Sequence, residues 1–183
     1  ATVSGILRTK DNFAGIIFKG VGKDFDHHRF EKFLIEGTTP KITGEGFNNE
    51  VTISEKLANN LKLKLKDSIV AIFSKADQKP IYRKFAVVGI YKTDIKLIDD
   101  LFIIGDLNHT RRILDMDKNT IGGVDVFLKN INNIDKNFPE IEALSGYKNF
   151  AEKATEKYPE IADWITIFDT NIALIITLML IVV

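Results

Sequence analysis

The stretch SIVAIFSKADQKPIYRKFAVVGIY, residues 68–91, decides the fold class of this chain. Ser68–Phe73 and Tyr82–Tyr91 are rich in Ile, Val and Phe, which favour half-buried strands. The polar segment Lys75–Pro80 between them contains Asp and Pro, residue types that are typical of turns. The stretch therefore predicts two strands joined as a hairpin.

Further short strands and helices are expected on both sides of this hairpin. Ser54 is predicted to cap one helix and Asp106 another, because each precedes a run with helical spacing of apolar residues. Other strands are expected at residues 2–7, 15–19, 50–53, 101–104 and 123–128, and other helices at 26–35, 134–144 and 151–158. Since strands and helices do not alternate in a regular βαβ rhythm, we expect an α+β fold.

The domain organisation follows from length and from the density of strands. A chain of 183 residues is long enough for one large domain or two small ones. We expect one two-lobed domain over residues 1–164, with a strand-rich middle lobe at about 48–128. The ends, 1–46 and 129–164, would then come together, and residues 165–183 would begin a different segment.

Composition is that of a folded globular chain. Hydrophobic residues make up 45% and charged residues 27%. Lys+Arg and Asp+Glu are both 25, so there is no general electrostatic attraction toward nucleic acid, and we expect no nucleic-acid partner. The sequence has no Cys, which excludes disulfides and Cys-based zinc sites.

The C-terminal stretch IALIITLMLIVV, Ile172–Val183, has no charged residue. A helix of this length is about 18 Å long, whereas the hydrocarbon core of a bilayer is about 30 Å thick. The run lacks the polar face of a surface helix, and it follows Trp164, a residue type common at membrane interfaces. We therefore expect residues 165–183 to be the start of a transmembrane helix that is cut partway. A buried C-terminal core helix is the alternative.

No pattern in the sequence predicts catalysis, a cofactor site or a metal site. Gly20–Asp24 lacks both the first Gly and the Ser or Thr of a phosphate-binding loop. Adjacent residues such as His27 and His28 rarely bring both rings to one ion, so we interpret them as part of a solvated helix start. The pair Asp99-Asp100 lies in a polar stretch typical of turns and caps. We expect no catalytic, cofactor-binding or metal-binding residue and hence no enzymatic activity.

Several short motifs occur in order along the chain. They are Lys19-Gly20-Val21, Ile53-Ser54-Glu55, Lys66-Asp67-Ser68-Ile69, Phe85–Tyr91, Ile98-Asp99-Asp100, Ile121–Val126, Asp169-Thr170-Asn171 and Met179–Val182. Together they resemble the permease subunits of a family of ABC transporters. That family includes the lipoprotein-releasing transporters (LolC/LolE-like), the macrolide exporter MacB and the division protein FtsX, and the lipoprotein-releasing branch is the most similar.

The resemblance implies a MacB-like periplasmic core domain, inserted between two transmembrane helices of a permease. It implies the bacterial inner (cytoplasmic) membrane, with this domain on the periplasmic side. It also implies a separate cytoplasmic ABC ATPase subunit and a second permease subunit in a homo- or heterodimer. The cargo would be a periplasmic or membrane substrate, most of all lipoproteins, and a periplasmic carrier is a candidate partner. The alternatives are an FtsX-type regulator of cell division and a soluble α+β ligand-binding domain.

Two sets of residues are candidates for function. A stiff helix entering the bilayer is a suitable lever between membrane and domain. The residues proposed for this coupling helix are Pro159, Trp164, Ile165, Thr166, Asp169 and Asn171. Those proposed for partner contact at the hairpin are Lys75, Asp77, Lys79 and Pro80. The hairpin is short and has no Met, unlike the long Pro- and Met-containing hairpin that hooks a carrier in some members of the family.

Overall fold

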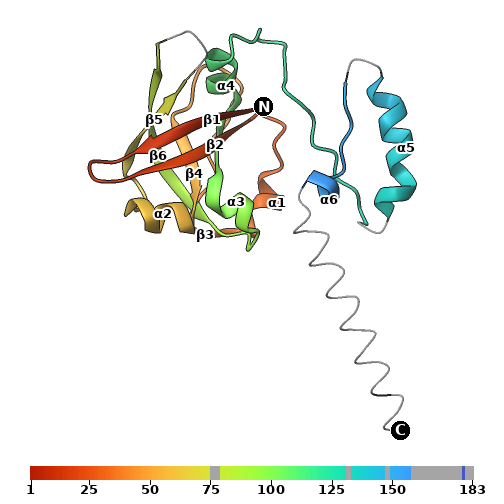
Figure 1. Ribbon diagram of the computed structural model, residues 1–183, viewed down its shortest axis with the longest axis horizontal. Helices are drawn as coiled ribbons and strands as arrows, with labels where there is room; N and C mark the ends of the chain where they lie inside the picture. Colours follow the sequence, from red (N-terminus) through yellow and green to blue (C-terminus); the bar gives the residue numbers. More distant parts are fainter. Residues whose placement is uncertain (75–78, 131–132, 147–148, 158–178, 180–183) are drawn as a thin grey trace. The chain divides into compact units, whose positions relative to one another are not determined.

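The computed structural model describes residues 1–74, 79–130, 133–146, 149–157 and 179 (Figure 1). It divides into two compact units, Ala1–Val124 and Asp125–Val183, which are described one at a time. The first unit contains every strand found in the described residues, and the second contributes two helices.

Seven strands in the described part of the first unit form one sheet, in the order β3-β6-β4-β7-β2-β1-β5. Their bounds are β1 Thr2–Arg8, β2 Phe13–Val21, β3 Leu34–Gly37, β4 Glu50–Ser54, β5 Ser68–Phe73, β6 Ile81–Tyr91 and β7 Phe102–Asp106. Strand β6 also pairs with β5, so the order β4-β7-β2-β1-β5-β6 closes into a barrel. Closure is possible because β6 is long: residues 81–86 pair with β5 and residues 86–91 with β4.

Apolar side chains fill the inside of the barrel. The Phe18 ring stacks on the Phe85 ring at a centroid distance of 5.3 Å and meets the Phe73 ring edge-on at 5.9 Å. Two glycines make room for these rings. A Cβ at Gly105 would lie 2.6 Å from Cζ of Phe18, and one at Gly5 would lie 2.7 Å from Cδ1 of Phe73. These rings and glycines are therefore part of a close-packed core.

Four short helices lie between or directly after the strands in the part of this unit that the structure describes. They are α1 His27–Glu31, α2 Glu55–Leu61, α3 Lys96–Leu101 and α4 Leu107–Ile113. Both predicted caps are confirmed. Ser54 Oγ accepts a hydrogen bond from the Leu57 amide at 3.0 Å, and Asp106 Oδ1 accepts one from the Asn108 amide at 2.9 Å. Since α2 and α4 start directly after β4 and β7, each cap also marks where its strand ends.

The predicted hairpin of residues 68–91 is confirmed, while other elements differ from expectation. The helix expected over residues 26–35 ends at Glu31, and Leu34–Gly37 is strand β3 instead. Pairing with β6 explains the change, because Leu34 lies opposite Tyr91 and Glu36 opposite Ile90. Helix α3 forms in a stretch for which no helix was expected.

The strand expected at residues 123–128 is wrong. Those residues belong to none of the strands in the described sheet, although Val124 and Val126 alternate with polar residues as a strand would. Alternation alone does not make a strand, because its backbone also needs a neighbour to pair with. The middle lobe expected at about 48–128 is part of a larger unit, since β1, β2 and β3 share its sheet.

The second unit holds helices α5, Ile134–Ser145, and α6, Ala154–Lys157. The helix expected at 134–144 is thus confirmed, with Pro139 inside it rather than at its start. Lys153 joins α6 to α5. Its Nζ lies 2.8 Å from Oδ1 of Asp135 and 3.2 Å from Oε1 of Glu156, and hydrogen bonds to these two carboxylates raise the pKa of Lys153.

Candidate interaction site

The hairpin predicted as a partner contact is the β5–β6 turn. Phe73 pairs with Ile81 as the last pair of the ladder, so the chain reverses within a few residues. Of the four residues proposed there, Lys79 and Pro80 are described and both are exposed. Lys75 and Asp77 lie outside the described residues. The described part of the hairpin therefore offers one cation and one Pro to a partner.

The proposed coupling residues, from Pro159 to Asn171, lie outside the described residues, as does the apolar run after them except for Met179. In the part of the chain that the structure describes, no helix is long and apolar enough to cross a membrane. The transmembrane helix expected at 165–183 therefore stays a prediction.

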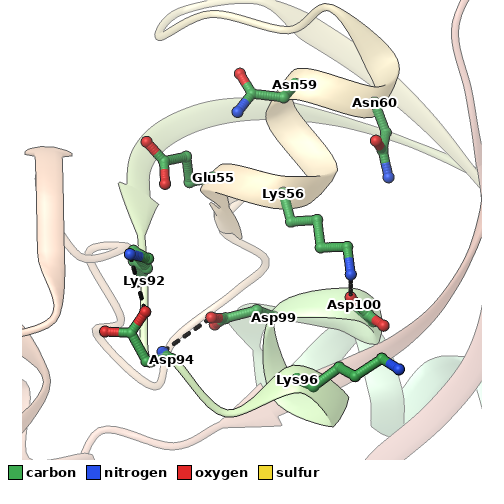
Figure 2. A pocket seen from close by; sticks show the side chains of 9 residues that line it. All are labelled: Glu55, Lys56, Asn59, Asn60, Lys92, Asp94, Lys96, Asp99 and Asp100. Atoms are coloured by element: carbon green, nitrogen blue, oxygen red, sulfur yellow. Dashed lines mark hydrogen bonds and ion pairs between the residues drawn. The ribbon is translucent and has the colours of Figure 1, made fainter.

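A polar cleft of about 500 Å³ opens between helices α2 and α3 (Figure 2). It was not expected from the sequence, because α3 was not. Its lining residues are Glu55, Lys56, Asn59 and Asn60 from α2, and Lys92, Asp94, Lys96, Asp99 and Asp100 from the turn before α3 and from α3 itself.

Asp99 closes the turn that leads into α3. Its side chain is buried, and it accepts hydrogen bonds from the Thr93 amide at 3.0 Å and the Thr93 hydroxyl at 2.8 Å. It also accepts one from the Asp94 amide at 3.0 Å (Figure 2). Asp94 has a positive φ of 62°, a conformation that Asp tolerates better than most residues. These bonds confirm the interpretation of Asp99 as a residue that stabilises a turn.

Charged groups in the cleft mostly pair with one another. Lys56 Nζ forms an ion pair with Asp100 Oδ1, and Lys92 Nζ lies 2.8 Å from Asp94 Oδ1 (Figure 2). The described lining has no Ser, Cys or His that could act as a nucleophile or as a base of neutral pH. The groups that would bind a charged ligand are therefore largely used to hold the fold together.

The cleft is also tied to the barrel. Ser54 Oγ, which caps α2, donates a hydrogen bond to the Asp99 carbonyl oxygen at 2.5 Å. The Tyr91 hydroxyl at the end of β6 donates to the Phe102 carbonyl oxygen at 2.8 Å, and burial raises the pKa of this Tyr above its ordinary value. These contacts tie β4, β6, α2 and α3 together at one corner of the barrel.

The residues considered for metal or phosphate binding have structural contacts. Asp26 Oδ1 accepts from the Arg29 amide at 3.2 Å as the cap of α1, and the His27 ring lies 2.8 Å from the Thr39 hydroxyl. A Cβ at Gly20 would lie 2.8 Å from Cα of Leu107, so this glycine lets α4 approach β2. Among the described residues, no group of three or more His, Asp or Glu could hold a metal ion.

His109 on α4 is buried, with 2% of its surface exposed. Its Nε2 lies 2.9 Å from the Asn48 carbonyl oxygen, an acceptor, so Nε2 carries the proton. Asp106 Oδ2 accepts from the Asn48 amide at 2.9 Å, and the two bonds fasten the segment before β4 to α4. Burial lowers the pKa of His109 below its ordinary value, so the ring is neutral in the folded protein at neutral pH.

Comparison with known proteins identifies the fold. The structure resembles the extracellular domain of a noncanonic ABC-type transporter, YknZ, from Gram-positive bacteria, with a TM-score of 0.53. The match covers 79% of this chain and 70% of that chain at 17% sequence identity. At this identity the likeness shows a shared α/β fold. No protein-family profile matches the chain, and no curated protein is similar to it in sequence.

Proposed function

We propose that this chain is the extracytoplasmic domain of an ABC transporter permease. The observation that carries the proposal is the shared fold with the extracellular domain of YknZ over most of both chains. Under this proposal the domain is not an enzyme. ATP hydrolysis belongs to a cytoplasmic ATPase subunit, and a second permease subunit completes the transporter in the bacterial cytoplasmic membrane.

Three of the ordered sequence motifs support the proposal, because in the structure they lie at joints of the barrel. Lys19-Gly20-Val21 ends β2 where α4 packs on it, and Ile53-Ser54-Glu55 is the junction of β4 and α2. Phe85–Tyr91 is the part of β6 that pairs with β4. Motifs in such places reflect a requirement of the fold, so the same fold explains why they recur in the same order.

Cargo and partners form the finer part of the proposal. The resemblance to lipoprotein-releasing permeases favours lipoproteins as cargo. The hairpin is short, and its described residues Lys79 and Pro80 lack the apolar surface of a long hook. This observation favours a role without a carrier that docks at the hairpin. It equally suits an FtsX-type regulator of cell division, which is the second candidate. A soluble ligand-binding domain is disfavoured, because the cleft between α2 and α3 uses its own charges internally.

The proposed mechanism couples the membrane to the domain through the segment from Pro159 to Asn171. Pro lacks an N–H and suits the first turn of a helix, so Pro159 defines a start without weakening the turns after it. A helix that continues from there into the bilayer moves the domain when ATP hydrolysis moves the membrane helices.

The test replaces Ile165 and Thr166 by Gly in the full-length transporter. Each Gly costs roughly 1 kcal/mol in helix propensity, enough to loosen a joint but not to unfold a domain. We expect normal expression and basal ATP hydrolysis with reduced cargo release. The matched control is Glu142→Gly with Ala143→Gly on exposed positions of α5, which should leave release unchanged.

Release at the wild-type rate by a normally expressed Ile165→Gly/Thr166→Gly transporter would refute the lever. Release lost equally in the α5 control would show that the defect is a general loss of helix stability. A protein that hydrolyses ATP with its partner but releases no lipoprotein in any form would favour the regulator.

A further inference from the structure

The outer face of four barrel strands carries an apolar and basic surface. The inward positions are fixed by buried residues such as Leu7, Phe18 and Phe73, so the alternate residues point outward. Strand pairing places them in rows. One row runs Gly15, Ile6, Ile72, Tyr82 and the next runs Phe13, Arg8, Val70, Lys84, each across β2, β1, β5 and β6. We call these two rows the sheet face.

Large apolar side chains of the sheet face are open to solvent. Phe13 is 78% exposed, Tyr82 60% and Ile6 46%. Gly15 leaves the row flat, since a Cβ there would meet nothing within 4 Å. With neighbouring strands about 4.8 Å apart, each row is roughly 15 Å wide. Adjoining exposed apolar residues of this kind mark a surface that binds a protein or a membrane.

Every residue on the outward positions of these strands that carries a charge at neutral pH is basic. Arg8 and Lys84 lie in the second row on β1 and β6, and Lys19 follows on β2. The outward positions of the four strands include no Asp or Glu, although the chain as a whole is neutral. The nearest acidic residues in sequence, Asp11 and Asp67, lie in turns outside the strands. A surface with this charge selects an anionic partner.

We propose that the sheet face docks on the anionic headgroups of the membrane next to the domain. The proposal rests on the proposed function, which places the domain beside a bilayer. Arg8 and Lys84 would bind lipid phosphates, while Phe13, Ile6 and Tyr82 would enter the boundary between headgroups and acyl chains. Exposed aromatic residues beside basic side chains are typical of the surfaces by which proteins bind to membranes.

The shape of the surface favours a lipid over a peptide. Peptides and protein partners bind through anchors in pockets. The sheet face lies on the outside of a closed barrel, and the cleft in the described residues is lined by α2, α3 and the turn before α3 instead. A flat surface with a few cations is sufficient for lipid. The tether to the membrane keeps the headgroups at high effective concentration, so each contact need only be weak.

The test places a fluorescent label on the sheet face of the full-length permease in lipid nanodiscs. Gly15→Cys, in a full-length protein freed of other cysteines, provides the site, because the position is open. Brominated phosphatidylglycerol and phosphatidylcholine serve as quenchers. We expect the label to be quenched in discs that contain about one third phosphatidylglycerol, and much less in pure phosphatidylcholine. A label on Glu31→Cys in α1, exposed but not on these strands, is the control for position.

Charge reversal by Arg8→Glu with Lys84→Glu should lower the equilibrium constant for lipid contact by at least about tenfold, because two attractive charges become repulsive. The control double variant, Lys41→Glu with Lys118→Glu, changes the net charge equally at exposed positions elsewhere and should leave quenching unchanged. Equal quenching at Gly15 and Glu31, or equal loss in both double variants, would overturn the proposal.

If lipid never quenches the label on the sheet face, but the face is protected in cells in a way that depends on Arg8 and Lys84, the partner is an acidic protein. That result would also overturn the proposal. Lipid quenching does not depend on cargo release. A failure here is therefore distinguishable from a failure of the lever.

Discussion

Two alanine substitutions of glycines, one inside the barrel and one outside, test the packing that closes the fold. Gly105 on β7 faces the barrel interior, where a Cβ would lie 2.6 Å from Cζ of Phe18 and 3.1 Å from Cγ1 of Val51. Phe18 cannot easily move away, since its ring is held between the Phe73 and Phe85 rings. Gly15 on β2 faces outward and would meet nothing within 4 Å.

The magnitudes follow from this difference. Adding a methyl group to a packed core costs about 1–3 kcal/mol, so Gly105→Ala should destabilise the protein by that amount. Gly15→Ala adds no clash and restricts the unfolded chain, which should stabilise by about 0.4–1 kcal/mol. The two variants should therefore differ by about 1.4–4 kcal/mol. For a unit the size of Ala1–Val124, about 1 kcal/mol shifts Tm by about 4 °C, so the Tm values should lie about 6–16 °C apart.

Thermal unfolding by circular dichroism, with urea unfolding as a second measure, gives both values. Equal stability of the two variants would mean that Gly105 does not face a filled interior. Rescue of Gly105→Ala by the smaller Phe18→Leu would identify the ring as the group that clashes.

Two further predictions concern buried polar groups. Because burial lowers the pKa of His109, the unfolded chain binds a proton below pH about 6.5, whereas the folded protein does not. The contribution of His109 to stability is therefore complete above that pH. Below it, the free energy of unfolding falls by up to about 1.4 kcal/mol per pH unit. Urea unfolding between pH 5 and 7.5 should show this slope and His109→Gln should flatten it, whereas an unchanged slope would place its origin at another group. Asp99→Ala leaves the Thr93 and Asp94 amides without their hydrogen-bond acceptor and should lower the free energy of unfolding by about 2–3 kcal/mol. Asp100→Ala breaks only a partly exposed ion pair and should cost about 0–1 kcal/mol, so equal losses would contradict the assigned role of Asp99.

Local signals were sufficient for part of the fold. Ser54 and Asp106 are cap residues in front of apolar helical faces, and both caps form as predicted. The hairpin of β5 and β6 has strong β-formers on either side of a Pro-containing turn, and its strands match the predicted bounds closely. In these places the local preference and the tertiary structure agree.

Long-range pairing could not be predicted in the same way. Leu34 becomes part of a strand only because Tyr91 lies opposite it, and no local pattern contains that information. Barrel closure depends on β6 having three neighbours, which strand propensity does not reveal. The alternation at Val124 and Val126 predicted a strand where none of the described strands offers a partner.

For the candidate sites, too, local features could be predicted from the sequence, whereas long-range placement could not. Asp99 was correctly interpreted as a turn residue, but its position between α2 and α3 required the structure. The sheet face was missed, because Ile6, Arg8, Phe13 and Tyr82 are ordinary residues in the sequence until the register aligns them. The coupling residues were proposed from the apolar run and from family resemblance.

The proposed function and the proposed lipid contact both require that the domain lies outside the cytoplasm. The chain has no Cys, so Asn60→Cys on the exposed side of α2 gives a single labelling site in a full-length protein freed of other cysteines. Spheroplasts are treated with a membrane-impermeant maleimide, with and without prior permeabilisation, and a Cys on the ATPase subunit serves as the cytoplasmic control. We expect equal labelling of Asn60→Cys in both samples, with the ATPase labelled only after permeabilisation. Labelling of Asn60→Cys only after permeabilisation would place the domain in the cytoplasm and contradict the proposed function.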